Sequence, residues 1–96
     1  MMIQTTSARS ETFSRLGRYF FAELTSGKHS IALSASAGEV RVIVTSNASH
    51  RAWRGLGKAF GSYAEAIANY KTPEVRAMLE EAQRLDAADA QAKEAA

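Results

Sequence analysis

The clearest pattern of hydrophobic and polar positions lies in residues 28–46. Apolar side chains occupy alternate positions on both sides of Gly38, as in Ile31, Leu33, Val40 and Val42. Such period-two alternation, rich in β-branched residues, is typical of half-buried strands. A glycine between two such runs is typical of a tight turn. The sequence therefore predicts an antiparallel hairpin over residues 28–46.

The C-terminal third of the chain has a helical pattern. Ser62 and Glu65 have the spacing of a capping box, which predicts a helix over residues 62–70. Thr72 and Pro73 are typical of a second helix start, and apolar positions then recur at helical spacing as far as Leu85. We therefore expect a second helix over residues 73–88 and a frayed, alanine-rich tail over residues 89–96.

The N-terminal part of the chain fits two patterns. The apolar residues between positions 10 and 25 share one face of a helix, although Gly17 costs a helix interior up to about 1 kcal/mol. The aromatic cluster in residues 17–24 also suits an edge strand. We favour the helix and keep the strand as the alternative. The polar residues 1–10 are expected to form a flexible N-terminus.

Residues 51–60 are expected to form a third, irregular strand, weakened by Gly55 and Gly57. The alternative is an irregular loop that ends in a short strand over residues 57–60. Together these elements predict a single α+β domain over residues 11–88. In it, a small antiparallel sheet packs against two C-terminal helices. A chain of 96 residues is long enough for one such core.

Composition narrows the chemistry that the chain can carry. The sequence has no cysteine, which removes disulfides, thiolate nucleophiles and cysteine-ligated metals and fits a cytoplasmic location. No apolar run is long enough to span a membrane. His29 and His50 are 21 positions apart, without the spacing of a metal or catalytic motif. We therefore expect a protein that is not an enzyme and that needs no cofactor or metal.

The charge distribution provides the functional hint. Residues 1–60 carry eight Lys or Arg and three Asp or Glu, whereas residues 61–96 carry four and seven. The segment 47–62 contains no acid but has three cations and the single tryptophan. Cations drive binding to phosphates, and interleaved aromatic rings offer stacking surfaces for bases. The sequence thus predicts DNA or RNA binding, centred on residues 50–58, through Lys28, His29, Arg41, His50, Arg51, Trp53, Arg54 and Lys58.

The alternative is a protein-interaction module, such as an adaptor, regulator or inhibitor. Ile43 lies on the strand face opposite Val40 and Val42, and a strand over residues 17–24 would leave Tyr19 or Phe21 outside the core. Apolar groups on a second sheet face suit a dimer interface or a docked partner. The same basic segment would then contact an acidic protein.

Overall fold

The computed structural model describes residues 2–13, 17–27, 29–36, 38–46 and 57–95. Within these residues the fold is α+β, as predicted, with one five-stranded antiparallel sheet in the order β1-β2-β3-β4-β5 and two helices. Each strand pairs with the next in the chain. The elements are β1 (Gln4–Phe13), β2 (Gly17–Ser26), β3 (His29–Ser36), β4 (Glu39–Ser46), β5 (Lys58–Phe60), α1 (Tyr63–Asn69) and α2 (Pro73–Ala95).

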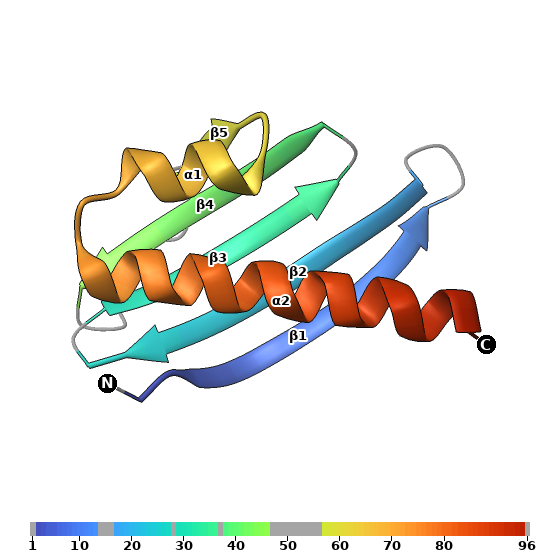
Figure 1. Cartoon of the computed structure of the whole chain (residues 1–96), viewed down its shortest axis with the longest axis horizontal. Coiled ribbons are helices and arrows are strands. Elements are labelled where there is room, and N and C mark those ends of the chain that lie inside the picture. The colour runs from blue at the N-terminus through green and yellow to red at the C-terminus, as the bar shows by residue number, and fades with distance from the viewer. Residues whose placement is uncertain (1, 14–16, 28, 37, 47–56, 96) are drawn as a thin grey trace.

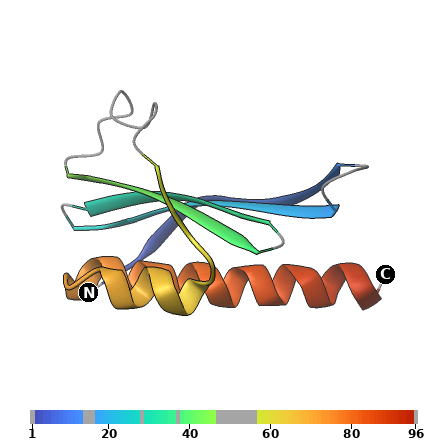
Figure 2. The same cartoon turned by 90° about the horizontal axis from the view of Figure 1, so that it is seen from above.

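The two helices form one layer on one face of the sheet (Figures 1 and 2). The long helix α2 runs diagonally across the strands, and the short helix α1 lies over the edge formed by β4 and β5. No described helix covers the opposite face of the sheet, which we call the open face. Among the described elements, both helices therefore lie on the same side of the sheet.

The predicted hairpin is confirmed. Strands β3 and β4 pair antiparallel from His29 opposite Ser46 to Ser36 opposite Glu39. Gly38 has a φ of +76°, a left-handed conformation that glycine adopts without steric cost. This conformation of Gly38 lets the chain reverse direction between β3 and β4.

The preferred helix over residues 10–25 is wrong. These residues include a strand, as the alternative proposed, but β2 lies between β1 and β3 rather than at the edge of the sheet. Gly17 has a φ of +69°, which a right-handed helix excludes, and it begins strand β2. Phe20, Ala22 and Leu24 are buried while the residues between them are half-buried, which is a period of two. Residues 4–10, which the sequence assigned to an N-terminal tail, belong to strand β1.

The predicted helices are present. Ser62 Oγ accepts a hydrogen bond from the Glu65 backbone N–H at 3.2 Å, as a capping box requires. The Glu65 carboxylate, however, accepts from the N–H of Gly61 at 2.8 Å rather than from that of Ser62. Helix α2 continues beyond the predicted limit at residue 88, as far as Ala95.

The core lies between the sheet and the helices. Leu24 and Ile31 from the sheet and Met78 and Leu79 from α2 are fully buried. Residues directly opposite each other on antiparallel strands project to the same face. The register therefore fixes which side chains point toward the helices and which lie on the open face.

Candidate functional site

A row of residues crosses the open face from β1 to β4. Arg9 lies opposite Phe21, Phe21 opposite Ser34, and Ser34 opposite Arg41. Neighbouring strands are about 4.8 Å apart, so the backbones of β1 and β4 are separated by about 14 Å. The row therefore has an arginine near each end, with an aromatic ring and a small hydroxyl residue between them.

The aromatic side chains on this face contact one another and a cation. The Tyr19 and Phe21 rings are 4.5 Å apart between centroids, at an interplanar angle of 59°. The Arg9 guanidinium lies 5.3 Å from the centroid of the Phe21 ring, within the range of a cation–π interaction. Strand β2 thus presents a small aromatic platform beside an exposed arginine.

A shallow depression of about 170 Å³ adjoins this platform. Ala32 and Ser34 of the central strand β3 form its floor because their side chains are small. Larger side chains on the neighbouring strands form its walls, Phe21 on one side and Ile43 on the other. Its described lining residues are Ser7, Arg9, Phe21, Ala22, Glu23, Ala32, Leu33, Ser34, Arg41 and Ile43.

The structure separates two of the predicted site residues. Arg41 is exposed on the open face, where its guanidinium is 3.3 Å from the Glu39 carboxylate. Lys58 lies opposite Val42, whose side chain is buried beneath the helices, and its ammonium donates to Asn69 Oδ1 of α1 at 3.1 Å. Arg41 and Lys58 therefore lie on opposite faces and do not form one patch through their described contacts.

His29 also points toward the helix layer. Its Nδ1 is 2.8 Å from Glu74 Oε2 in the first turn of α2. Both side chains are partly exposed. His29 is thus at the expected end of the sheet, but it is engaged with α2. The other predicted site residues, Lys28, His50, Arg51, Trp53 and Arg54, lie outside the described residues.

Gly57 connects the acid-free segment to the open face. A Cβ atom added to this glycine would lie 3.0 Å from Arg41 Cγ and 3.5 Å from Ile43 Cγ1. The backbone at Gly57 therefore runs directly against the side chains at one wall of the depression. This close approach also explains why glycine suits this position.

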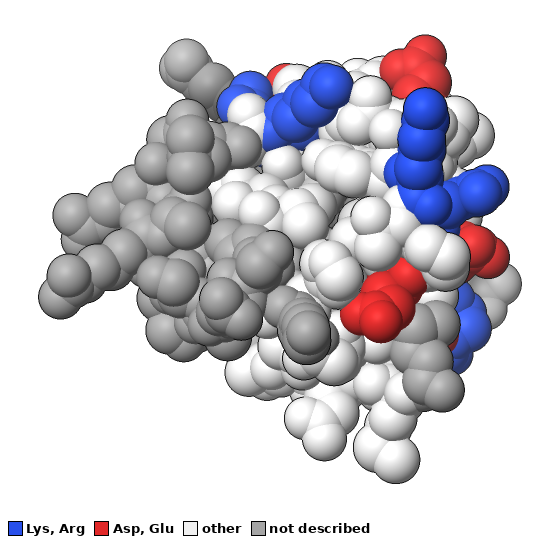
Figure 3. Space-filling model, turned by 90° about the vertical axis from the view of Figure 1, so that its left-hand side faces the viewer, with Lys and Arg blue, Asp and Glu red and all other residues white. Residues whose placement is uncertain are grey.

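The described charges are mixed in sign. Glu23 lines the depression together with Arg9 and Arg41, and Glu39 pairs with Arg41. On the side drawn in Figure 3, described Lys and Arg side chains lie among Asp and Glu side chains rather than in one continuous basic surface. Among the described lining residues of the depression, the cations are Arg9 and Arg41.

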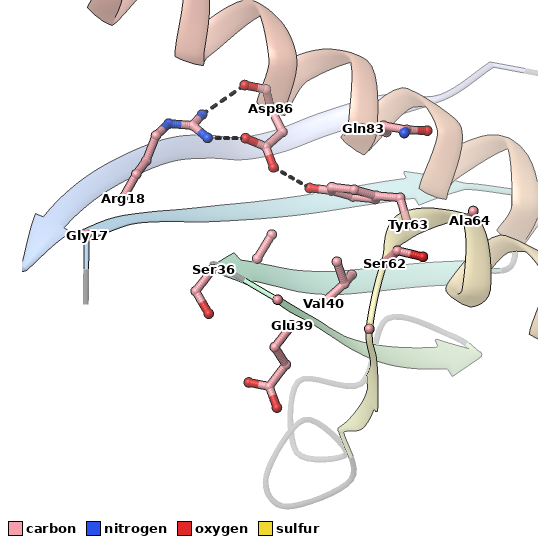
Figure 4. A pocket seen from close by; sticks show the side chains of 13 residues that line it. Gly17, Arg18, Ser36, Glu39, Val40, Ser62, Tyr63, Ala64, Gln83 and Asp86 are labelled. Carbon is pink, nitrogen blue, oxygen red and sulfur yellow. Dashed lines mark hydrogen bonds and ion pairs between the residues drawn. The ribbon is translucent and has the colours of Figure 1, made fainter.

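A second, larger cavity of about 570 Å³ lies at the end of the sheet near Gly17 (Figure 4). The Asp86 carboxylate accepts hydrogen bonds from Arg18 Nη1 and, at 2.6 Å, from the Tyr63 hydroxyl. Arg18 Nη2 also donates to the Asp86 backbone carbonyl at 2.8 Å and to Asp89 Oδ2 at 3.0 Å. This network joins β2, α1 and α2.

Ionisation in this network follows from burial and hydrogen bonding. Burial raises the pKa of Tyr63, and the hydrogen bond with Asp86 raises it further. Burial lowers the pKa of Arg18, but hydrogen bonds with Asp86 and Asp89 outweigh this effect, so the pKa stands above its ordinary value. Arg18 and Tyr63 are therefore both held in their protonated forms.

Sequence reasoning missed Arg9 as a site residue, because the polar N-terminal segment gave no strand signal. It left open whether Tyr19 and Phe21 lie outside the core, since that depended on the helix or strand choice. The alternation of residues 17–24 was the signal that placed both rings on the open face. Arg18 was missed because its partners Asp86 and Asp89 are distant in sequence.

Comparisons with known proteins add no identification. No protein-family model matches the chain, and neither a curated protein nor a solved structure gives a significant match. Within the described residues, no helix has the length and apolar character needed to span a membrane. The described part of the chain also contains no group of three or more His, Asp or Glu residues placed to hold a metal ion.

Proposed function

We propose that this protein binds nucleic acid, without catalysis, through the open face of its sheet. The observation that carries the proposal is the row Arg9, Phe21, Ser34 and Arg41, which combines two cations with an aromatic ring across neighbouring strands. Arginines neutralise backbone phosphates, and aromatic rings stack with bases. The lack of cysteine in the sequence is in keeping with a cytoplasmic location for this role.

The acid-free segment 47–62 supplies further cations to the proposal. Its residue Gly57 packs against the Arg41 side chain on the open face. In this proposal Arg51 and Arg54 contact phosphates beside the row, and Trp53 provides a further ring. Lys58 contributes less, because its ammonium is directed toward Asn69.

Fluorescence anisotropy tests the proposal with labelled single-stranded DNA, double-stranded DNA and RNA at about 50 and 200 mM salt. The wild type is compared with Arg9→Ala/Arg41→Ala and with a matched control, Lys71→Ala/Arg76→Ala, which removes two exposed cations from the helix layer. We expect the first variant to bind more weakly, with a salt slope lower by about 1.5–2, and the control to resemble the wild type. Absence of binding to all three ligands at low salt would overturn the proposal.

A protein partner is the second candidate. The observation that favours it is the mixed charge of the open face, where Glu23 and Glu39 accompany Arg9 and Arg41. Opposite charges side by side suit the polar rim of a protein interface. Two results together would establish this alternative. The wild type would bind no nucleic acid, and a protein partner would bind the wild type but not the Phe21→Ala variant.

A further inference from the structure

The depression on the open face lies at the centre of the sheet and is bounded by large side chains. Ala32 has Glu23 directly opposite on β2 and Ile43 directly opposite on β4. Ser34 has Phe21 and Arg41 in the corresponding positions. The small residues of β3 therefore form a slot two residues long, with a ring and a carboxylate on one wall and an aliphatic chain and a guanidinium on the other.

We infer that this slot receives one unpaired base of a single-stranded nucleic acid and prefers a base that carries an amino group. This inference rests on the proposed function. In a duplex both faces of every base are stacked, so a base can enter the slot only from an unpaired strand. In this inference Arg9 and Arg41, near the two ends of the row, meet the phosphates on either side of the base, and Glu23 faces the base itself.

The preference for an amino group follows from the chemistry of Glu23. An ionised carboxylate accepts hydrogen bonds and donates none. Cytosine presents an exocyclic amino group, whereas thymine presents a carbonyl oxygen at the same position. Glu23 thus stabilises cytosine in the slot and is repelled by the oxygen of thymine.

The experiment uses anisotropy titrations of the full chain with oligodeoxycytidine, oligodeoxythymidine and a duplex of equal length. Ala32→Ile fills the floor of the slot with a β-branched side chain that a strand tolerates. Ala59→Ile is the matched control, because Ala59 lies opposite Arg41 on the same face but outside the described lining of the depression. Glu23→Gln removes the charge while keeping the side-chain size. Circular dichroism verifies that each variant is folded.

We expect Ala32→Ile to weaken binding of the single strand about tenfold or more, as loss of one stacked base does, and Ala59→Ile to change it less than about twofold. The wild type is expected to bind oligodeoxycytidine about threefold to tenfold more tightly than oligodeoxythymidine, and Glu23→Gln to abolish this difference. If Ala32→Ile binds the single strand as tightly as the wild type, or if the duplex binds as tightly as the single strands, the slot is wrong while the proposed function stands. If no nucleic acid binds the wild type, both fail.

Discussion

Asp86 links β2, α1 and α2 through its hydrogen bonds, and its removal should destabilise the protein strongly. Its carboxylate accepts from both Arg18 and Tyr63. The Asp86 side chain is 14% exposed and that of Arg18 is 31% exposed. Asp86→Ala therefore removes two hydrogen bonds to a charged acceptor in a site largely shielded from water.

The magnitude follows from these contacts. A hydrogen bond to a charged group contributes about 1.5–3 kcal/mol. Arg18 keeps Asp89 and the backbone carbonyl of residue 86 as partners, and its partial exposure screens the lost charge. We therefore expect a loss of about 2–4 kcal/mol in the free energy of unfolding, out of roughly 5–14 kcal/mol for a chain of this length. Asp86→Asn keeps the shape and one acceptor and should lose about half as much.

Urea unfolding followed by circular dichroism measures this effect, with the midpoint expected to fall at unchanged slope. Arg84→Ala is the control on the same helix, because Arg84 pairs with Glu81 on an exposed surface. Exposed pairs of this kind contribute little, so its midpoint should not move measurably. If Asp86→Ala unfolds at the same urea concentration as Arg84→Ala, the network does not join the layers and this reasoning is refuted.

Three further predictions concern the same fold. Burial and the Asp86 hydrogen bond raise the pKa of Tyr63, so above about pH 10 the folded chain keeps a proton that the unfolded chain loses. The free energy of unfolding should therefore fall as the pH rises further, by up to about 1.4 kcal/mol per pH unit for this group. Urea unfolding at several pH values should show that the free energy of unfolding falls less steeply with pH in Tyr63→Phe than in the wild type. An identical dependence on pH would contradict the raised pKa of Tyr63. Gly38→Ala should cost about 1–2 kcal/mol in thermal melts, since φ is +76° and no described atom lies within 4 Å of the added Cβ, so a neutral result would argue against the left-handed turn. Met78→Ala removes a fully buried side chain and should cost about 2–5 kcal/mol in urea, whereas a cost below about 1 kcal/mol would place Met78 outside the core.

The elements that the sequence predicted correctly are those with local signals. The hairpin has strict alternation and a glycine turn, and the first helix has the cap formed by Ser62 and Glu65. The segment around Gly17 was misjudged because Phe20 and Phe21 fit two patterns. They share a helical face with Phe13, and they belong to the aromatic cluster of residues 17–24 that suits a strand. The positive φ of Gly17, which decides between them, is not visible in a hydrophobic pattern.

Edge strands and long-range partners account for what could not be predicted. Strand β1 is composed mainly of small polar residues, and it is held by backbone pairing with β2, which leaves no hydrophobic signature. The candidate site depends on this strand, because Arg9 reaches the open face only through that pairing. Charge counting identified Arg41 but grouped it with Lys58, since the face on which a side chain lies depends on register.

The central claim is that the open face of the sheet binds nucleic acid, and an NMR titration tests it most directly. Backbone amide shifts of the isotopically labelled protein would be followed as an unlabelled single-stranded oligonucleotide is added. The proposal predicts that the largest shifts lie on the open-face row, at Arg9, Phe21, Ser34 and Arg41, while amides in the exposed part of α2 around Arg76 remain unchanged. Shifts concentrated on α2, or none at saturating oligonucleotide, would contradict it.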